Sequence, residues 1–368
     1  MKLRYKLLNT VLAIIGVAIV SLALVLSYDS ACEQAPAPQV NGKTALMQAI
    51  VYRCYGSPEV LGLEQIEKPA PGPDQVLVKV QTASVNPLDW HYMRGSPYFM
   101  RLGSGIGAPS DHRFGVDFAG TVAAVGEEVT QFEPGDEVFG GASGAFGEYV
   151  VVRETGAITL KPPGLGFEQV AAAPIAGISA LQALREAKVT SGMKVLVNGA
   201  SGGVGTFAVQ IAKVLGAEVT GVCSDRNTEL VRSLGADHVI DYRSHDYTTG
   251  DKRYEVIIDN VGNHSPARNR RALVPGGKLV MVGGPSGNWI GPLTNPLQAF
   301  LLSPFVDEEF ILFLGQLKQQ DLAYLGELMA SGQVTAVIDR RYPLAQVPEA
   351  IGYSEEGRAR GKIIIEVN

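Results

Sequence analysis

The sequence predicts an α/β fold in which a doubly wound parallel sheet stands beside a second, β-rich domain, preceded by one apolar helix. Three observations lead to this prediction. Apolar runs of strand length alternate with helix-length segments between about residues 167 and 314, which is typical of α/β folds. A glycine-rich turn follows one of these runs. Near the N-terminus, residues 7–28 carry no charged side chain and are mostly apolar.

Four apolar runs predict the strands of the parallel sheet, at 195–198, 218–223, 254–259 and 277–283. Runs that are apolar almost throughout are typical of parallel strands that helices cover on both faces. The segment 207–215, between the first two runs, has helical periodicity and the length that a crossover between parallel strands requires. These elements predict the βαβ organisation of a doubly wound sheet.

The turn after the first strand has the sequence Ala-Ser-Gly-Gly-Val-Gly over 200–205. It fits the pattern G-x-G-x-x-G except that alanine replaces the first glycine. Such a turn presents N–H groups and the positive end of a helix to a pyrophosphate, although some glycine-rich turns only provide positive φ angles. We expect Gly202 to admit the phosphates and Gly205 to let helix and strand pack closely. The predicted dinucleotide-binding residues of the turn are Ser201, Gly202, Gly203, Val204 and Gly205.

The residue after the second strand selects between the two nicotinamide dinucleotides. An acidic side chain there would bind the ribose hydroxyls of NADH, but the chain has Ser224, followed by Asp225 and Arg226. A hydroxyl and a guanidinium suit the 2′-phosphate of NADPH, while the carboxylate of Asp225 repels it. A simple helix N-cap is the alternative interpretation. We predict NADPH in preference to NADH.

Five further motifs accompany the glycine-rich turn, at 115–120, 132–139, 176–184, 233–242 and 361–365. Together they resemble the medium-chain dehydrogenase/reductase superfamily, in its zinc-independent quinone oxidoreductase branch, from about residue 47 onwards. The resemblance implies a GroES-like β-barrel catalytic domain and a Rossmann domain, with the active site in the cleft between them. The expected segments are a membrane anchor over 1–28, a linker over 29–46, a GroES-like domain over 47–166 that 315–368 completes, and a Rossmann domain over 167–314.

The resemblance also implies residues at the cofactor. In relatives, a serine after the second strand and a tyrosine 18 residues later contact the 2′-phosphate, and Ser224 and Tyr242 stand at those positions. Relatives have a lysine three residues after the serine, where this chain has Asn227. We therefore expect Arg226 to supply the positive charge.

Three further residues are expected near the nicotinamide. Ser179 stands where relatives have a nicotinamide-facing threonine, although an ordinary helix residue is the alternative. Asn198 and Asn260 follow two of the predicted strands. Ligands of open α/β sheets bind at the carboxyl ends of the strands, so we expect both amides at the cofactor.

A catalytic zinc site is not expected. Zinc needs about three protein ligands such as Cys and His, but Val116 and Asp117 stand where zinc-dependent relatives have His-Glu, and 84–86 contains no cysteine. The chain has three cysteines and no C-x-x-C pair, which excludes a four-cysteine lobe and a disulfide scaffold. Without a Lewis acid, a quinone or an α,β-unsaturated carbonyl is the easier hydride acceptor, because it spreads the developing negative charge.

These observations predict a zinc-independent oxidoreductase that transfers a hydride from NADPH to a quinone or enone. One alternative is a zinc-free alcohol or aldehyde dehydrogenase with the same cofactor. Another is a non-catalytic NADPH-binding membrane adapter, since the fold alone does not establish activity. The net charge of −6 argues against a nucleic-acid partner.

The predicted catalytic residues lie in the stretch 84–95, which resembles an Asn-x-x-Asp motif of the branch. Asn86 could donate to a substrate carbonyl, Asp89 could orient it, and Tyr92 or His91 could supply a proton. The structural alternatives are a turn at Asn86, a helix cap at Asp89 and a core position for Tyr92.

The apolar stretch 7–28 follows Lys2, Arg4 and Lys6. It is long enough to span a bilayer, and a cleaved signal peptide with a shorter apolar core is the alternative. We expect an uncleaved single-pass anchor with a spacer at 33–39. The positive-inside rule places the enzyme outside the cytoplasm, but a cytoplasmic cofactor favours the cytoplasmic side, which we expect.

A second apolar patch combines 299–302 with 310–314. Core packing or an interface is the expected role of such a patch. A homodimer is therefore a partner that the sequence allows.

Overall fold

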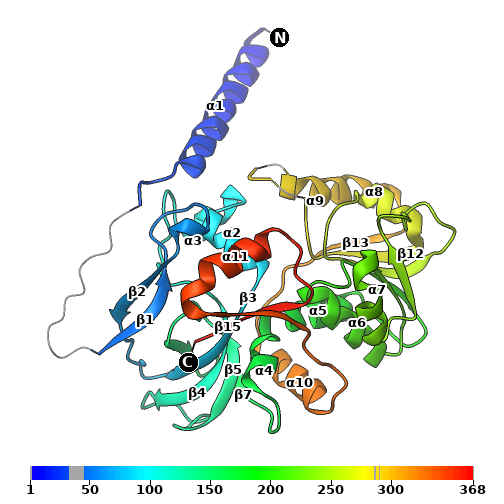
Figure 1. Cartoon of the computed structure of the whole chain (residues 1–368). Helices are drawn as coiled ribbons and strands as arrows, with labels where there is room; N and C mark the ends of the chain where they lie inside the picture. Colours follow the sequence, from blue (N-terminus) through cyan, green and yellow to red (C-terminus); the bar gives the residue numbers. More distant parts are fainter. Residues whose placement is uncertain (1, 33–44, 286, 290, 368) are drawn as a thin grey trace.

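The structure is a computed structural model that describes residues 2–32, 45–285, 287–289 and 291–367, with no side chains described for 2–8 and 11–12. The helix α1 (Lys2–Ser27) projects from a body made of two β-containing domains (Figure 1). One domain contains the sheet of mostly antiparallel strands, and the other contains the parallel sheet.

The barrel-like domain has a seven-stranded sheet in the order β14-β15-β3-β4-β5-β7, with β6 paired to β3. Val76, Val78 and Val80 alternate along β3 and are fully buried, because side chains two residues apart share one face of a strand. A separate hairpin joins β1 (Leu46–Val51) to β2 (Gly62–Glu67). The strands of the main sheet are β3 (Gln75–Val85), β4 (Asp117–Val125), β5 (Glu137–Gly141), β6 (Tyr149–Arg153), β7 (Ile158–Leu160), β14 (Ile338–Pro343) and β15 (Lys362–Glu366).

The second domain contains a parallel six-stranded sheet in the order β10-β9-β8-β11-β12-β13. This order reverses direction after β8, which is the doubly wound arrangement of a Rossmann domain. Its strands are β8 (Lys194–Asn198), β9 (Glu218–Cys223), β10 (His238–Asp241), β11 (Tyr254–Asp259), β12 (Leu273–Met281) and β13 (Glu309–Leu312). Its main helices are α5 (Pro174–Glu186), α6 (Gly203–Val214), α7 (Thr228–Ser233), α8 (Pro266–Asn269) and α9 (Gly291–Leu302).

The α/β prediction with GroES-like and Rossmann domains is confirmed. The strands β9 and β11 have the predicted bounds. The strand β12 both begins and ends earlier than the predicted 277–283; its pairing with β11 shifts in register, and Gly276 adopts a positive φ of 72° within the strand. The two edge strands, β10 and β13, are short and half-exposed, and we did not predict them as strands.

Four helices lie around the barrel-like sheet or between the two sheets. The helix α2 follows β3, and α11 packs against α2. The helix α4 packs on β3 and β4, while α10 packs on α5. Their bounds are α2 (Pro87–Arg94), α4 (Phe167–Ala171), α10 (Gln319–Ala330) and α11 (Val347–Glu355).

The predicted membrane anchor over 1–28 is wrong. Among the described residues, no helix combines the length and apolar character that crossing a bilayer requires. The prediction of a single-pass membrane protein is wrong for the same reason. The proposed spacer at 33–39 lies outside the described residues.

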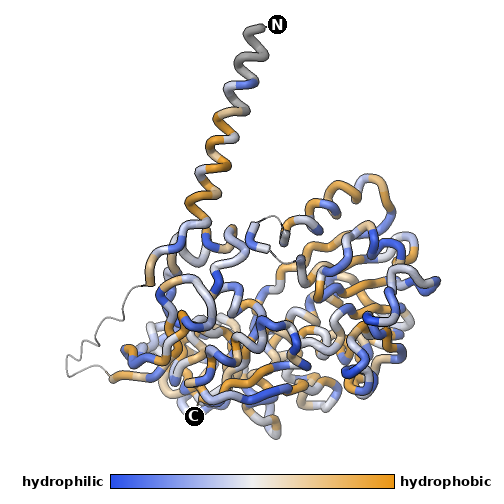
Figure 2. Tube along the Cα trace, turned by 45° about the horizontal axis from the view of Figure 1, so that its top comes forward, coloured by the Kyte–Doolittle hydropathy of each residue, from blue (hydrophilic) through white to orange (hydrophobic). Residues whose placement is uncertain are grey.

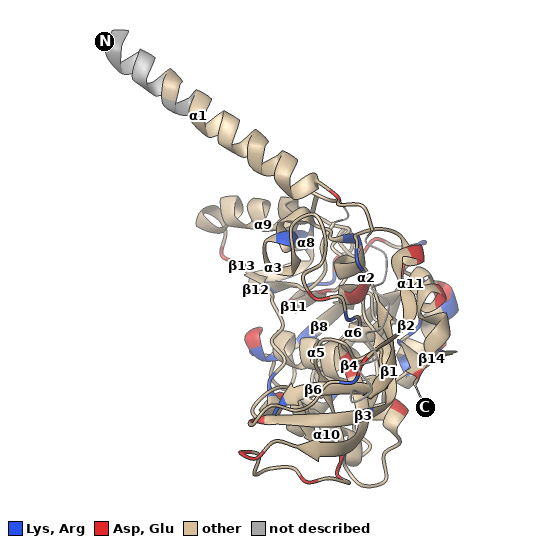
Figure 3. Cartoon of the chain, turned by 90° about the vertical axis from the view of Figure 1, so that its left-hand side faces the viewer, with Lys and Arg blue, Asp and Glu red and all other residues tan. Residues whose placement is uncertain are grey.

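The described side chains of α1 are mostly apolar and uncharged (Figures 2 and 3), and its C-terminal end is attached to the barrel-like domain. Leu26 is buried, and the Ser30 N–H donates to the Gly107 carbonyl at 2.9 Å. A disulfide joins Cys32 to Cys54. The sequence analysis did not anticipate this disulfide, because three cysteines without motif spacing do not indicate a pairing.

The second apolar patch is divided between core and surface. Ala299 and Phe313 are buried, whereas Phe300 is 75% exposed and Leu314 is 77% exposed. Part of the patch therefore packs in the Rossmann domain, and a homodimer remains a prediction.

Candidate active site

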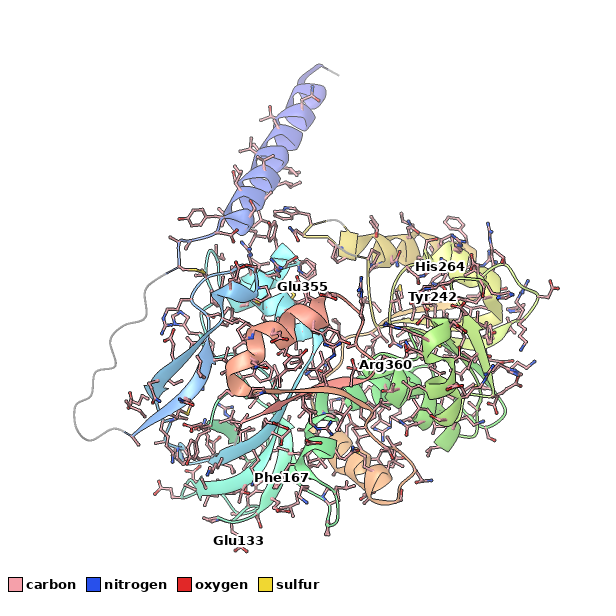
Figure 4. All side chains as sticks on the ribbon, viewed as in Figure 1. Glu133, Phe167, Tyr242, His264, Glu355 and Arg360 are labelled. Carbon is pink, nitrogen blue, oxygen red and sulfur yellow. A yellow bond between two sulfur atoms is a disulfide. The ribbon has the colours of Figure 1, made fainter. Side chains whose placement is uncertain are left out.

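The glycine-rich turn lies at the carboxyl end of β8, where α6 begins. It contacts the barrel-like domain directly, because the Gly361 N–H donates to the Ser201 carbonyl at 2.9 Å and Gly202 pairs with Gly361 as an isolated bridge. Arg360, the residue before Gly361, lies where the two domains meet (Figure 4). The turn therefore faces the boundary between the two domains.

Two glycines of the turn, Gly202 and Gly205, differ in what surrounds them. A Cβ added at Gly205 would lie 2.1 Å from the Gly199 carbonyl oxygen and 2.8 Å from Ala200 Cα, so close packing of helix on strand requires glycine there. A Cβ added at Gly202 would meet only the Gly199 oxygen, at 3.5 Å. Packing within the chain therefore does not explain Gly202, and the open space there is what the close approach of a phosphate would require.

The residues expected at the 2′-phosphate lie at the ends of two neighbouring strands. Ser224 follows β9, Tyr242 follows β10, and the Tyr242 N–H donates to the Cys223 carbonyl at 3.1 Å. Ser224 is buried and Tyr242 is 55% exposed. The Arg226 guanidinium donates to the Arg358 carbonyl at 3.1 Å. The fold thus places Ser224 and Tyr242 at the ends of two paired strands, and Figure 4 shows Tyr242 in the Rossmann domain.

Asn227 stands where relatives have a lysine, and it contacts the glycine-rich turn. Its Nδ2 donates to the Ser201 hydroxyl at 2.9 Å. Its Oδ1 is buried and has no hydrogen-bond partner. A buried amide oxygen without a partner is costly, so this atom is suited to accept a hydrogen bond from a ligand.

The two asparagines at the carboxyl ends of β8 and β11 have different environments. Asn198 Nδ2 donates to Asp259 Oδ1 and to Asn263 Oδ1, both at 2.8 Å. Asn260 Nδ2 donates to the Asn198 carbonyl at 2.9 Å, while its Oδ1 is buried without a partner. Asn198 therefore joins the strand ends, and Asn260 has a free acceptor. Ser179 is half-buried on α5 and faces Gly315.

Two of the predicted catalytic residues, Asn86 and Asp89, lie in a buried cluster of polar side chains. Asn86 is 1% exposed, its Nδ2 donates to Asp117 Oδ2 at 2.8 Å, and its Oδ1 accepts from Lys362 Nζ at 2.5 Å. Asp89 is 1% exposed, and its carboxylate accepts the Asn86 N–H at 2.7 Å. Both ends of the Asn86 amide are therefore occupied by the protein itself, which favours a positioning role over contact with substrate.

The ionisable groups of this cluster have shifted pKa values. The pKa of Asp89 is raised to about 7, mainly by burial and also by the neighbouring Asp117, while the hydrogen bond from the Asn86 N–H and the charge of Lys362 oppose the rise. Burial also raises the pKa of Asp117 and lowers the pKa of Lys362. Each shift reflects the cost of placing a charge in a poorly solvated interior.

Two residues further along α2 remain partly accessible. Tyr92 is half-buried. His91 Nδ1 lies 2.7 Å from the Ser96 carbonyl, so this nitrogen carries the proton. Burial lowers the pKa of His91, which keeps the ring neutral at pH 7. The catalytic roles of Asn86, Asp89 and Tyr92 remain predictions.

The sequence analysis missed a contact between the two domains beyond α2. The Tyr98 N–H donates to the Asn288 carbonyl at 2.8 Å, and the Ser96 hydroxyl donates to Asn288 Oδ1 at 2.7 Å. The rings of Tyr98 and Trp289 meet edge to face, with centroids 5.0 Å apart. No periodicity indicates these residues, because they lie in loops.

The sequence analysis also missed Lys362, which lies in the motif at 361–365 but was assigned no role. The one sequence feature that could have indicated a role is the position of this lysine at the start of an otherwise apolar strand. Across the described residues, no three His, Cys, Asp or Glu side chains converge in a way that could hold a metal. At the motif Gly115-Val116-Asp117, the acidic side chain pairs with this lysine instead.

Comparison with known proteins identifies the class. Residues 72–162 match the alcohol dehydrogenase GroES-like domain family, and residues 234–365 match the zinc-binding dehydrogenase family. The chloroplast envelope quinone oxidoreductase homolog of Arabidopsis thaliana is 33% identical over 344 residues, which cover 87% of this chain and 98% of that protein. The 2-methylene-furan-3-one reductase of Solanum lycopersicum is 33% identical, with 91% and 84% covered.

A solved structure supports the same class. The quinone oxidoreductase from Coxiella burnetii has a TM-score of 0.79 and 30% identity, with 88% of this chain and all of that chain covered. The chain belongs to the medium-chain dehydrogenase/reductase superfamily. Within it, the chain is an oxidoreductase of the quinone oxidoreductase-like branch that uses a nicotinamide cofactor. The alternative of a non-catalytic membrane adapter is therefore wrong.

Proposed function

We propose that this protein reduces quinones or α,β-unsaturated carbonyl compounds with NADPH. The observation that carries the proposal is the open position at Gly202, beside a buried Asn227 oxygen and at the boundary between the two domains. Relatives named quinone oxidoreductase, 2-methylene-furan-3-one reductase and trans-enoyl reductase support this substrate class.

The choice of NADPH rests on the corner formed after β9 and β10. Ser224 and Tyr242 would hold the 2′-phosphate, and Arg226 would supply a positive charge. The turn at 201–205 would hold the pyrophosphate, with Asn260 Oδ1 as an acceptor nearer the nicotinamide. When bound, NADPH supplies the hydride.

The protein's own residues provide orientation and exclude water. The amides of Asn198 and Asn260 hold the strand ends together. The contacts of Ser96 and Tyr98 with Asn288 join the two domains, and a site that excludes water strengthens its electrostatic interactions. His91 holds its proton at Nδ1 against the Ser96 carbonyl, so Tyr92 or water is the better proton source.

We propose that the reaction does not need zinc, because the sequence replaces the ligand residues of zinc-dependent relatives. A zinc-free alcohol dehydrogenase is the second candidate. It is favoured by an NAD-dependent alcohol dehydrogenase structure that is 27% identical, with a TM-score of 0.75. That activity requires an alcohol or aldehyde substrate, which distinguishes it from the first candidate.

The test follows the absorbance of NADPH with the purified full chain, a metal chelator and a panel of quinones, enones and aldehydes. Turnover of a quinone or enone in the chelator supports the proposal. Turnover restricted to aldehydes supports the second candidate, and turnover that the chelator abolishes overturns zinc independence.

A pair of glycine variants tests the cofactor site. Gly202→Asp places a carboxylate at the pyrophosphate and should abolish NADPH binding, measured by fluorescence titration. Gly250→Asp is the matched control, because a Cβ at Gly250 meets no atom within 4 Å and the residue is exposed. Equal NADPH affinity in the two variants would remove the turn from the binding site.

A further inference from the structure

Lys362 lies at the boundary between the two domains and contacts both. Its backbone follows Gly361, which pairs with the glycine-rich turn. A Cβ added at Gly203 would lie 3.2 Å from Lys362 Cδ, so the aliphatic stem passes against the first turn of α6. The side chain therefore begins beside the proposed cofactor loop.

The amine of Lys362 lies at the N-terminus of α2. Its Nζ donates to the Val85 carbonyl at 2.9 Å and to Asn86 Oδ1 at 2.5 Å, and it lies 3.4 Å from Asp117 Oδ2. Lys362 is 2% exposed and Asp117 is fully buried. All three donors of the ammonium group therefore have protein acceptors, in one fixed arrangement.

The same cluster also contacts α5, the first of the main helices of the Rossmann domain. Asp117 Oδ1 accepts the Ile175 N–H, in the first turn of α5, at 3.2 Å. The Ser84 hydroxyl donates to Asp117 Oδ2 at 3.2 Å and to the Ala171 carbonyl at 2.8 Å. Lys362 and Asp117 thus connect β3, β4, β15, α2 and α5 through side chains that are almost fully buried.

We propose that Lys362 is a positioning residue for hydride transfer, which holds the N-terminus of α2 at a set distance from the glycine-rich turn. The proposal rests on the proposed function, because α2 carries Tyr92 and His91, the two residues predicted to supply a proton to the substrate. Lys362 does not touch substrate. It acts through Asn86, whose main chain begins α2.

Stability alone does not explain this lysine. Replacing a buried ion pair with apolar side chains of similar volume is often neutral or stabilising, and β15 continues with three isoleucines. A buried cation with fixed acceptors specifies one arrangement of the elements around it. Since a displacement of about 1 Å in a reactive geometry can cost about 100-fold in rate, such an arrangement has a direct use here.

The test compares Lys362→Met with Lys161→Met. Lys161 is the matched control, because its side chain is 6% exposed in the same domain and its Nζ contacts Glu137 at 2.9 Å and the Leu165 carbonyl at 2.7 Å, away from α2. We expect kcat to fall about 100-fold in Lys362→Met, with the NADPH Kd changed by less than about threefold. We expect both values to be unchanged in Lys161→Met.

The primary isotope effect on kcat, measured with NADPH deuterated at the transferred position, separates positioning from loss of folded enzyme. Misplacement slows hydride transfer, so the isotope effect should rise in Lys362→Met. A smaller folded fraction lowers kcat but leaves the isotope effect unchanged, and that outcome would overturn the proposal. Full activity in Lys362→Met would overturn it as well.

If Lys362→Met does not fold, the double variant with Asp117→Asn removes the unpaired carboxylate and carries the same expectation. Amide hydrogen exchange of 87–95 in the NADPH complex gives a readout that needs no substrate. Exchange of α2 should accelerate in the Lys362 variants and not in Lys161→Met, and unchanged exchange contradicts the proposal. A wild-type chain without turnover overturns the proposed function alone, since the exchange measurement still decides the role of Lys362.

Discussion

Lys362 and Arg101 are both almost fully buried cations, at 2% and 1% exposed, but different partners hold them. The Lys362 amine contacts the side chains of Asn86 and Asp117, which no solvent reaches. The Arg101 guanidinium contacts main-chain carbonyls, one half-exposed carboxylate and the rings of Tyr55 and Tyr98. One cation therefore depends on a closed cluster of charges, and the other depends on a chain segment that has docked.

Arg101 holds the end of α1 on the barrel-like domain. Its NH1 donates to the carbonyls of Leu26 and Tyr28, at 2.9 and 3.0 Å, and its Nε donates to the Gly95 carbonyl at 2.7 Å. Its NH2 pairs with Asp29 at 2.8 Å, and the Asp29 side chain is 52% exposed. A cation at the C-terminus of a helix also interacts favourably with the helix dipole.

The difference predicts how each site fails. Removing Lys362 leaves two carboxyl groups buried in an interior that cannot open without separating several strands. Removing Arg101 leaves carbonyls that water can reach once the segment 26–32 lifts away. Removing Lys362 should therefore destabilise the whole fold, whereas removing Arg101 should destabilise only the docked segment 26–32.

The largest effect is expected for Lys362→Met. Breaking a buried pair by removing one partner costs about 3–5 kcal/mol, because Asp117 and Asp89 lose their cation. Urea unfolding at about pH 8 measures the loss, which should shrink as the pH is lowered, because burial raises the pKa of both carboxyl groups and favours their neutral forms. Lys161→Met should cost less than half as much, since its partner Glu137 is 51% exposed. Equal costs in the two variants would erase the contrast between closed and open charge clusters.

The next effect is expected for Arg101→Met. Hydrogen bonds from a charged donor are worth about 1.5–3 kcal/mol, so we expect a local loss of about 2 kcal/mol in the docking of 26–32. Hydrogen exchange at the Ser30 amide measures it, because this N–H donates to Gly107. The urea midpoint of the two domains should stay unchanged. A lower midpoint would show that the segment supports the whole fold.

A smaller effect is expected from the pH dependence of stability. Burial raises the pKa of Asp89 to about 7, above the value of about 3.9 in an unfolded chain. The folded state therefore retains a proton that the unfolded state has lost, so this contribution is present below about pH 4 and disappears as pH rises through 7. Asp89→Asn should flatten that part of the stability profile, whereas the exposed Asp251→Asn should not. An unchanged slope in Asp89→Asn would place the titration elsewhere.

The smallest effect is expected at an exposed ion pair. Arg341 and Glu168 form two contacts, at 2.8 and 2.7 Å, but their side chains are 48% and 35% exposed. Exposed pairs contribute about 0.2–1 kcal/mol, so Arg341→Ala should lower the free energy of unfolding by about 0.5 kcal/mol. A loss comparable to that of Lys362→Met would mean that burial does not determine how much an ion pair contributes to the free energy of unfolding.

Local patterns were sufficient for the centre of the Rossmann domain. The bounds of β9 and β11 were predictable, because apolar runs covered on both faces leave a strong signal in the sequence. The role of Gly205 was also predictable, because the motif places a helix directly against its strand. The edge strands β10 and β13 were missed, since they are short and half-exposed and lack that signal.

For the N-terminal segment, composition alone led to a wrong prediction. Its hydropathy led us to predict a membrane span, which the structure contradicts. Its attachment through Arg101 and the Cys32–Cys54 disulfide depends on residues at 95–107 and 54, and no sequence pattern links those positions to α1.

The sequence by itself determined the α/β class, the position of the glycine-rich turn between strand and helix, and the family, because these follow from periodicity and from motifs within about ten residues. The tertiary structure alone decided that Asn86 is enclosed, that Lys362 meets Asn86 and Asp117 across 276 and 245 residues, and that Asn288 bridges to Ser96. The physical reason is that burial and charge pairing depend on which distant strands become neighbours. A local pattern records the type of each residue, and only the folded chain determines its partners.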